Sequence, residues 1–122
     1  MPGYKAFEEL PVWQAAQALA VCVYQLTSGE HFRRDFALRD QMRRAAISIP
    51  SNIAEGFERR SKNQLAYSLN VAKGSAGELR SQLLLAKELG HLKPEAVDGA
   101  AEQCREVSRQ LSAFASSLRP AK

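Results

Sequence analysis

Apolar residues recur three or four positions apart along most of the chain, a spacing that places them on one face of a helix. The pattern predicts four long helices, which begin near Pro11, Phe36, Ser61 and Pro94. Residues that end helices follow three of them: Ser28-Gly29, Gly90 and Pro120. Alternation of apolar and polar residues with a period of two is absent, so no strand is predicted. Four helices with short connections predict an all-α, antiparallel up-down-up-down four-helix bundle.

The second predicted helix is apolar on more than one side. Its main stripe consists of Leu38, Met42, Ala45, Ile49, Ile53 and Phe57, and a second flank carries Ala46, Ile47 and Ala54. Pro50 lies in its middle and cannot donate to the carbonyl of Ala46, a defect that costs about 3 kcal/mol in a helix interior. We therefore predict a kink near Ile49–Pro50, with a complete break as the alternative. Ser48, Ser51 and Asn52 are candidates to bond the freed backbone groups.

The other three helices each have an apolar stripe as well. The first is apolar around most of its circumference, with helical spacing at Val12, Trp13, Ala16, Leu19, Ala20, Val23 and Leu26. The third carries Leu65, Leu69, Ala72, Ala76, Leu79, Leu83 and Ala86, and Gly74 and Gly77 add a smooth patch for the close approach of another helix. The fourth carries Val97, Ala100, Cys104, Val107, Leu111, Phe114 and Leu118. We assign residues 1–7 to an N-terminal arm and residues 8–119 to one bundle domain.

Length and composition fit a single globular domain. The chain has 122 residues, and 45% of them are hydrophobic, which is enough to bury a core. No cleavable leader and no apolar run of about 18–20 residues is present in the sequence, so a cytoplasmic protein without a membrane partner is expected. The two cysteines, Cys22 and Cys104, form neither a disulfide framework nor a metal-binding spacing.

The net charge of +4 is concentrated in and beside the second helix. Residues 33–62 hold eight basic and four acidic side chains, and the rest of the chain holds nine of each. A candidate phosphate-binding surface follows from this excess, formed by Arg39, Arg43, Arg44, Arg59, Arg60 and Lys62. Such a surface gains affinity from counterion release, which increases with the number of phosphates contacted. The alternative is a solvated face that Asp40, Glu55 and Glu58 partly neutralise.

No set of residues indicates catalysis or metal binding. Glu88 and His91 have the spacing of a di-iron motif in a helical bundle, but the second such motif is missing. Both cysteines fall on apolar faces, where a free thiol is usually a small core residue. We therefore expect no catalytic, cofactor-binding or metal-binding residues, and no enzymatic activity.

Polar and small residues near the proline have two interpretations. In the first, Asn52, Glu55 and Gly56 form a polar pocket at the kink. In the second, which we favour, their roles are structural. Asn52 would then bond backbone that Pro50 frees, Glu55 would pair with Arg59 one turn later, and Gly56 would permit close packing.

Several segments together resemble a known family. They are Leu10-Pro-Val-Trp13, the block Gln41-Met-Arg-Arg-Ala-Ala-Ile-Ser-Ile-Pro-Ser-Asn-Ile-Ala-Glu-Gly56, Ala72-Lys-Gly-Ser75 and Gln82-Leu-Leu-Leu-Ala-Lys87. The chain resembles the four-helix-bundle proteins encoded in intervening sequences of 23S ribosomal RNA genes. This resemblance implies a small bacterial protein that assembles into a ring-like homopentamer. Resemblance to a related branch, the accessory protein of diversity-generating retroelements, implies a basic barrel that binds nucleic acid and a reverse transcriptase.

The leading functional hypothesis is a non-enzymatic oligomeric scaffold. It would bind RNA, DNA or a nucleoprotein partner electrostatically through the six basic residues, without reading the base sequence. The alternative is a protein–protein interaction module that binds no nucleic acid. Exposed apolar flanks on the first two helices favour self-association in both cases.

Overall fold

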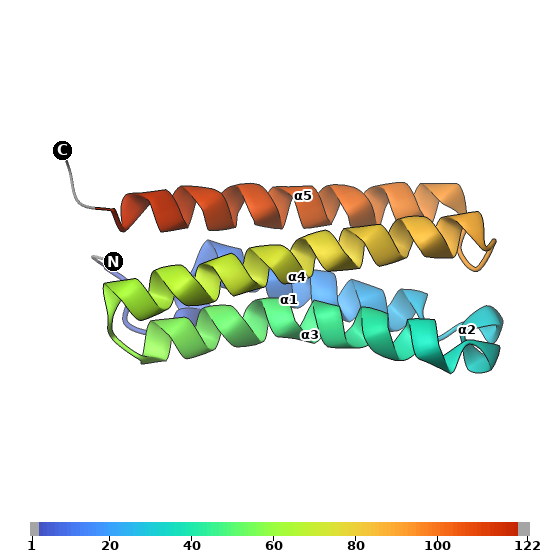
Figure 1. Cartoon of the computed structure of the whole chain (residues 1–122), viewed down its shortest axis with the longest axis horizontal. Coiled ribbons are helices and arrows are strands. Elements are labelled where there is room, and N and C mark those ends of the chain that lie inside the picture. Colours follow the sequence, from blue (N-terminus) through green and yellow to red (C-terminus); the bar gives the residue numbers. More distant parts are fainter. Residues whose placement is uncertain (1–2, 120–122) are drawn as a thin grey trace.

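The computed structural model describes residues 3–119 and consists of helices (Figure 1). The long helices are α1 (Pro11–Leu26), α3 (Phe36–Glu58), α4 (Lys62–Glu88) and α5 (Pro94–Ser117). Two short helices accompany them, the 3-10 helix η1 (Phe7–Glu9) and α2 (Glu30–Arg34). No strand occurs among the described residues. The predicted all-α class and four-helix bundle are thereby confirmed.

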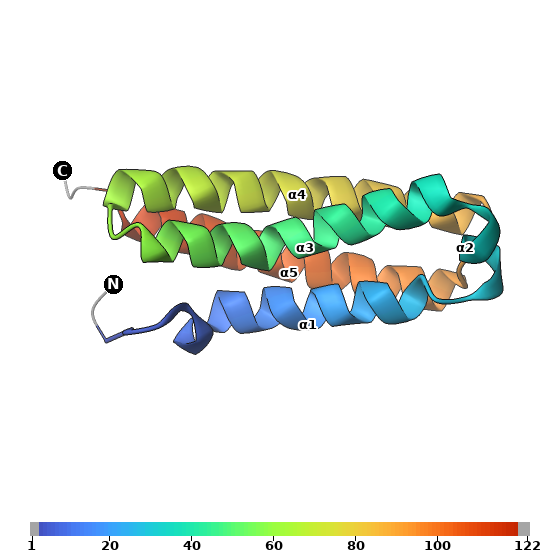
Figure 2. The ribbon, with the colours of Figure 1, turned by 90° about the horizontal axis from the view of Figure 1, so that it is seen from below.

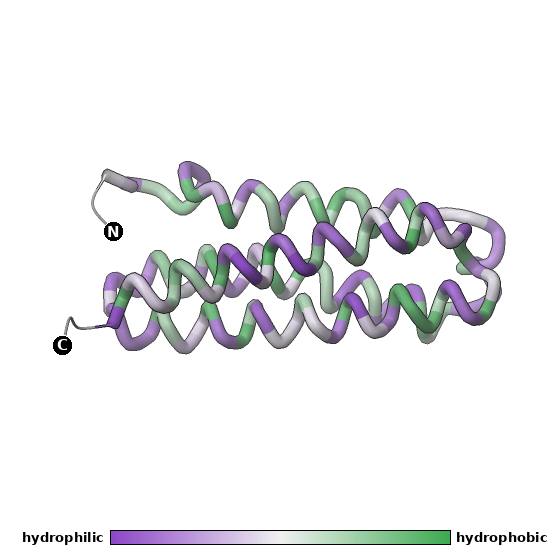
Figure 3. Tube along the Cα trace, turned by 90° about the horizontal axis from the view of Figure 1, so that it is seen from above, coloured by the Kyte–Doolittle hydropathy of each residue, from purple (hydrophilic) through white to green (hydrophobic). Residues whose placement is uncertain are grey.

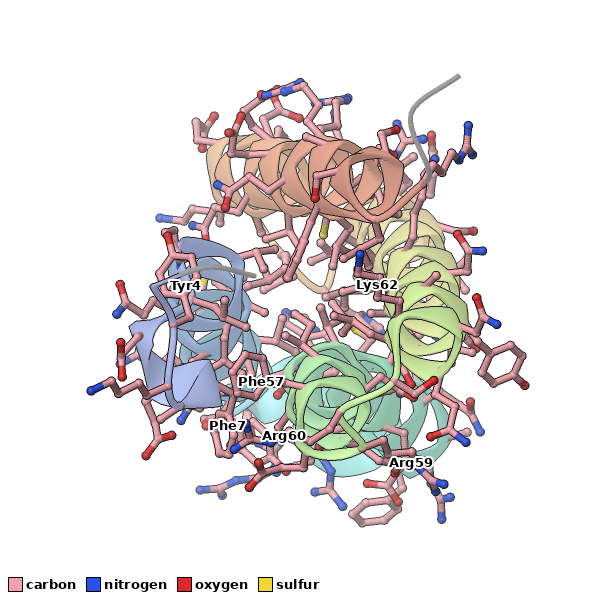
Figure 4. The ribbon with its side chains drawn as sticks, turned by 90° about the vertical axis from the view of Figure 1, so that its left-hand side faces the viewer. Tyr4, Phe7, Phe57, Arg59, Arg60 and Lys62 are labelled. Atoms are coloured by element: carbon pink, nitrogen blue, oxygen red, sulfur yellow. The ribbon has the colours of Figure 1, made fainter. Side chains whose placement is uncertain are left out.

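Successive long helices run antiparallel and occupy the four corners of a bundle (Figures 1 and 2). Helix α3 packs between α1 and α4, and α5 packs between α4 and α1. Helices α1 and α4 therefore lie at opposite corners, as the view along the bundle axis shows (Figure 4). A surface on α1 and a surface on α4 consequently face in different directions.

The predicted apolar stripes form the core. Every residue of the stripes predicted for α3 and α4 is buried, and so are the first five residues of the α5 stripe. Hydrophobic positions recur along each long helix, between hydrophilic ones (Figure 3). Trp13, Leu26, Phe114 and Leu118 are only partly buried against this core. The centre of the bundle is thus better covered than its corners and its ends.

Local sequence signals determine where the helices begin and end. The Asp35 carboxylate accepts a hydrogen bond from the Leu38 amide at 3.2 Å and caps α3, and the Ser61 hydroxyl accepts one from the Gln64 amide at 3.3 Å and caps α4. Gly90, with a φ of +76°, ends α4. The short helix α2 lies in the connection between α1 and α3. The predicted role of Pro120 lies outside the described residues.

Helix α3 is continuous through Pro50, which excludes the predicted alternative of a complete break. The two halves of α3 run in slightly different directions (Figure 2), in accordance with the predicted kink. Asn52 does not bond the Ala46 carbonyl that the proline frees. Its amide donates to the carbonyl and the hydroxyl of Ser48, at 2.8 and 3.0 Å, because it lies on the flank that faces α4.

Candidate interaction surfaces

An apolar groove runs along the surface between α1 and α3. Its volume is about 540 Å³. It is lined by Phe7, Trp13, Gln17, Ala20, Val21, Tyr24, Gln25, Ile47, Pro50, Ser51 and Ala54. Val21 and Ile47 keep 51% and 44% of their surface exposed. Of the second apolar flank predicted for the proline-containing helix, Ile47 thus remains exposed among the described residues, whereas Ala46 is buried.

Helix α1 contains no charged residue between Pro11 and Leu26. Its solvent-facing positions include Gln14, Gln17, Ala18 and Gln25. A helix at the corner of a bundle normally carries charged side chains on its outer face. Depletion of charge is instead typical of the centre of a protein–protein interface. The charge-free helix and the groove beside it therefore form one continuous candidate interface.

A second exposed apolar surface lies on α4. It consists of Tyr67, Leu85 and Leu89, which expose 71%, 49% and 51% of their surface. Spacings of 18 and 4 residues place the three on one side of the helix, with Tyr67 about 27 Å along the axis from Leu85. Gly74 and Gly77 lie between them, and a Cβ added to either would meet nothing within 4 Å. The close helix approach predicted at these glycines is not made within the chain.

Two of the three arginines in the first half of the basic set have partners within the chain. The Arg43 guanidinium donates to the Thr27 hydroxyl at 2.8 Å and to the Tyr24 and Thr27 carbonyls at 3.4 Å. It also lies 4.4 Å from the centre of the Tyr24 ring. Arg43 thus binds the carboxyl end of α1, where a cation is favourable. Arg39 pairs with Asp40 at 3.1 Å, whereas Arg44 is exposed and forms no ion pair with a described residue.

The second half of the basic set lies at the far end of α3. Sixteen residues separate Arg43 from Arg59, which corresponds to about 24 Å along a helix. Arg59 forms the predicted one-turn pair with Glu55, at 3.5 Å. Arg60 and Lys62 are exposed and form no ion pair with a described residue. The structure therefore does not gather the six predicted residues into one patch.

The polar set near the proline faces α4. The Ser48 and Ser75 hydroxyls are 2.8 Å apart, which joins α3 to α4 by a hydrogen bond, and Asn52 extends this contact through Ser48. A Cβ added to Gly56 would lie 2.6 Å from Cβ of Ser68. The close contact of Gly56 agrees with the packing role predicted for it. Asn52 bonds Ser48 and not the carbonyl that Pro50 frees, and together with Glu55 it also lines a surface pocket of about 270 Å³.

A contact between the connection that precedes α3 and the connection that follows α4 was not predicted from the sequence. His91 follows α4, and its Nε2 lies 3.0 Å from the carboxylate of Asp35, the residue that caps α3. Its ring stacks on His31 and meets the edge of Phe32, with ring centroids 5.5 and 5.3 Å apart. The His91 hydrogen bond is the main cause that lowers the pKa of Asp35. The only sequence signal was Gly90, whose positive φ turns the chain back.

Among the described residues the structure provides no cluster of metal ligands, and it buries one of the two thiols. No group of three or more histidine, cysteine or acidic side chains is arranged to hold a metal ion in residues 3–119. Cys104 is buried, and burial raises the pKa of its thiol to about 12. None of the described helices combines the length and the apolar character needed to cross a membrane.

Comparisons with known proteins agree with this architecture. The model of the 23S rRNA-intervening sequence protein family matches residues 8–113. The chain is also similar to a crystal structure of a protein of unknown function, from the S23 ribosomal protein family of Bacteroides thetaiotaomicron, with a TM-score of 0.78 and 22% identity. The match covers 85% of this chain and 97% of that one. No curated protein matches. With the family match extending over most of the bundle, the chain belongs to the 23S rRNA-intervening sequence protein family.

Proposed function

We propose that this protein is a non-enzymatic scaffold that assembles with copies of itself through the α1–α3 groove. The observation that carries the proposal is the charge-free helix α1 beside exposed Val21 and Ile47. Exposed apolar surface of this kind marks interaction sites in soluble proteins. The open apolar groove between α1 and α3 supports this interaction role.

The position of the second apolar surface favours a ring. Helices α1 and α4 lie at opposite corners of the bundle, so the groove of one copy and the α4 surface of another can meet head to tail. A head-to-tail contact uses two different surfaces and produces a ring when its rotation closes. The family resemblance sets the proposed number at five.

Light scattering on wild type and two variants tests this assembly. Five chains of 13.5 kDa give about 67 kDa. Val21→Glu combined with Ile47→Glu should yield monomers, because each carboxylate would have to lose its water in the contact. Ala37→Glu places the same charge at an exposed position of α3 outside the groove and should leave the oligomer intact. A monomeric wild type at micromolar concentration would contradict the proposal.

Nucleic-acid binding is the second candidate function. The observation in its favour is that Arg44, Arg60 and Lys62 are exposed and form no ion pair with a described residue. Three cations per chain are few, but a ring would repeat them. Because Arg39, Arg43 and Arg59 have partners within the chain, we expect them to contribute less to binding.

Anisotropy titrations with single-stranded RNA, single-stranded DNA and duplex test the second candidate. We expect micromolar binding at low salt without sequence preference, lost steeply as salt rises, with a slope near −0.9 per phosphate contact on duplex DNA. Replacing Arg44, Arg60 and Lys62 with Gln should flatten that slope while light scattering shows an unchanged oligomer. Absence of binding to all three nucleic acids would leave the scaffold as a protein-interaction module alone.

A further inference from the structure

A pocket opens at the end of the bundle where α3 passes into α4 (Figure 4). Its volume is about 190 Å³. Phe57, Leu65 and Leu118 provide apolar walls, and Tyr4, Arg60 and Lys62 add polar groups. The residues that line the α1–α3 groove are different ones. An inference about this pocket therefore does not depend on the proposed self-association.

Two cations line this pocket and have no ion-pair partner among residues 3–119. Arg60 lies beside Phe57, and Lys62 lies on another side of the bundle end (Figure 4). The neighbouring Arg59 pairs with Glu55, but no carboxylate lies within 4 Å of a charged nitrogen of Arg60 or Lys62 in the described part of the chain. Glu58, the closest acidic residue in sequence, pairs with neither. Two positive charges that line one pocket raise its electrostatic potential and favour the binding of an anion there.

The backbone of Arg60 is held in an unfavourable conformation. Its φ of +60° makes it the one residue other than glycine with a positive φ in residues 3–119. This position directly follows the end of α3, where glycine is usual because it has no Cβ. Glycine would end the helix at lower conformational cost. Strained residues of this kind concentrate at functional sites, where the side chain offsets the strain through its function.

The shape and polarity of the pocket restrict its ligand. The Ser61 hydroxyl accepts the Gln64 amide and keeps its own O–H donor, so it joins the guanidinium, the ammonium and the Tyr4 hydroxyl as the donors that line the pocket. Guanidinium groups bind carboxylate and phosphate oxygens in pairs. An apolar cavity of about 150 Å³ holds a benzene ring, so the walls here have room for a ring-sized body.

We propose that this pocket binds a small organic anion, with an oxyanion head at Arg60, with Lys62 as a second positive charge on another side of the pocket, and with a ring-sized apolar body against Phe57, Leu65 and Leu118. The head is a carboxylate or a phosphate. The apolar body separates this ligand class from inorganic phosphate, which would leave the apolar walls exposed to water. The apolar body also distinguishes this ligand class from a nucleic-acid backbone, whose phosphates contact cations without filling an apolar pocket.

Calorimetric and ligand-observed NMR titrations of the intact oligomer test the ligand class. Phenyl phosphate and benzoate represent the two heads, inorganic phosphate lacks the body, and benzyl alcohol lacks the charge. We expect phenyl phosphate or benzoate to bind at least about tenfold tighter than both phosphate and benzyl alcohol, since each charged hydrogen bond and each buried ring adds affinity. Equal binding of benzyl alcohol, or no binding of either aryl anion at about 10 mM, roughly ten-thousandfold above micromolar, overturns the proposal.

Three variants test the residues. Arg60→Gly should weaken binding of the aryl anion about tenfold or more, yet raise the melting temperature, because glycine fits the positive φ. Lys62→Gln should weaken binding by a smaller factor. Arg59→Gln removes an adjacent cation that does not line the pocket and should leave affinity unchanged. A lower melting temperature and unchanged affinity in Arg60→Gly would instead make Arg60 a structural residue.

A short single-stranded oligonucleotide serves as the competing probe. If it binds and is displaced by neither aryl anion, while Arg60→Gly weakens it, the two cations contact backbone phosphates. That result would overturn the proposal for a small ligand. Displacement of the oligonucleotide by phenyl phosphate at the affinity measured calorimetrically supports it.

Discussion

Helix α3 meets α4 along one flank and α1 along the other, and the two contacts are built differently. Toward α4, Gly56 lies against Ser68, and the Ser48 and Ser75 hydroxyls form a hydrogen bond. Toward α1, an apolar groove of about 540 Å³ remains open, and Arg43 supplies the hydrogen bonds at one end. Small residues close the first contact, whereas larger apolar side chains leave the second incomplete.

This difference indicates a separate structural role for each flank of α3. Close packing and satisfied polar groups define a single arrangement of two helices. An apolar surface that is left partly open gains stability only when something else covers it. The flank toward α4 therefore determines the fold of the chain, and the flank toward α1 is the part that an assembly partner can complete.

The largest expected effect distinguishes two glycines of these flanks. Gly56→Ala would place a Cβ 2.6 Å from Cβ of Ser68, so α3 and α4 would have to separate. We expect a loss of about 1–3 kcal/mol in the free energy of unfolding, despite the higher helix propensity of alanine. Gly74→Ala meets nothing within 4 Å and should gain up to about 1 kcal/mol in an isolated chain. Urea denaturation of both variants measures the two values.

Opposite signs for these glycines would support the comparison. Equal stabilisation by both substitutions would show that α3 and α4 can separate without cost. Destabilisation or loss of the oligomer in Gly74→Ala, with Gly56→Ala as expected, would place Gly74 in a contact between copies.

The second effect concerns the hydrogen bonds of the open flank. Arg43→Gln removes the charged donor from the Thr27 hydroxyl and from the carboxyl end of α1. We expect it to cost about 1.5–3 kcal/mol of unfolding free energy, as hydrogen bonds to charged groups do. The matched control Arg44→Gln replaces an exposed neighbour and should change stability by less than about 0.5 kcal/mol. Similar values for the two variants would show that the Arg43 hydrogen bonds do not stabilise the packing of α1.

Much of the bundle, but less of its surface, was predictable from the sequence. The stripes of α3 and α4 are local periodicities, and each residue in them is buried as predicted. Periodicity cannot tell which flank a neighbour covers, so Ile47 counts as apolar in the pattern although it remains 44% exposed. The glycines show the same limit. Gly56 packs tightly, whereas Gly74 and Gly77 do not, and only the three-dimensional arrangement distinguishes them.

The candidate sites were predicted least well because they depend on long-range pairs. Charge along the sequence suggested one basic surface, but a long helix separates its two halves, and Arg43 turns toward α1. The contact of His91 with Asp35 joins residues 56 positions apart in the sequence, and no local pattern signals it. The positive φ of Arg60 could not be predicted from the sequence either, because an arginine gives no local signal for this backbone conformation.

The third effect is the pH dependence of the contact between Asp35 and His91. The His91 hydrogen bond and then the Leu38 amide lower the pKa of Asp35 below its ordinary value of 3.8. A lowered pKa in the folded state stabilises the protein above the unfolded pKa, and this stabilisation is lost as the pH falls through the folded value. Asp35→Asn retains a helix cap but lacks the charge. Its stability deficit relative to wild type should therefore shrink between about pH 5 and pH 2, in urea denaturation at each pH.

The conservative variant His91→Gln provides the control for that pH series. It keeps a hydrogen-bond donor near Asp35 and removes the imidazole. A deficit in Asp35→Asn that stays constant with pH would mean that the charge of Asp35 contributes nothing. If His91→Gln retains the full pH dependence, the Leu38 amide alone accounts for the lowered pKa.

The smallest effect uses the two cysteines as reporters of the two parts of the bundle. Cys104 lies in the closed core, where burial raises its thiol pKa to about 12, so almost no reactive thiolate exists near neutral pH. Cys22 lies on α1 and is only half-buried.

In a Cys22→Ser background, Cys104 should not react with a maleimide at pH 8 until denaturant unfolds the chain. In a Cys104→Ala background, Cys22 should react in the native state, and faster in the monomeric Val21→Glu/Ile47→Glu variant than in the oligomer. Native reactivity of Cys104 equal to that of Cys22 would mean that α5 separates from the bundle as readily as α1, and the contrast between a closed and an open side of the molecule would not hold.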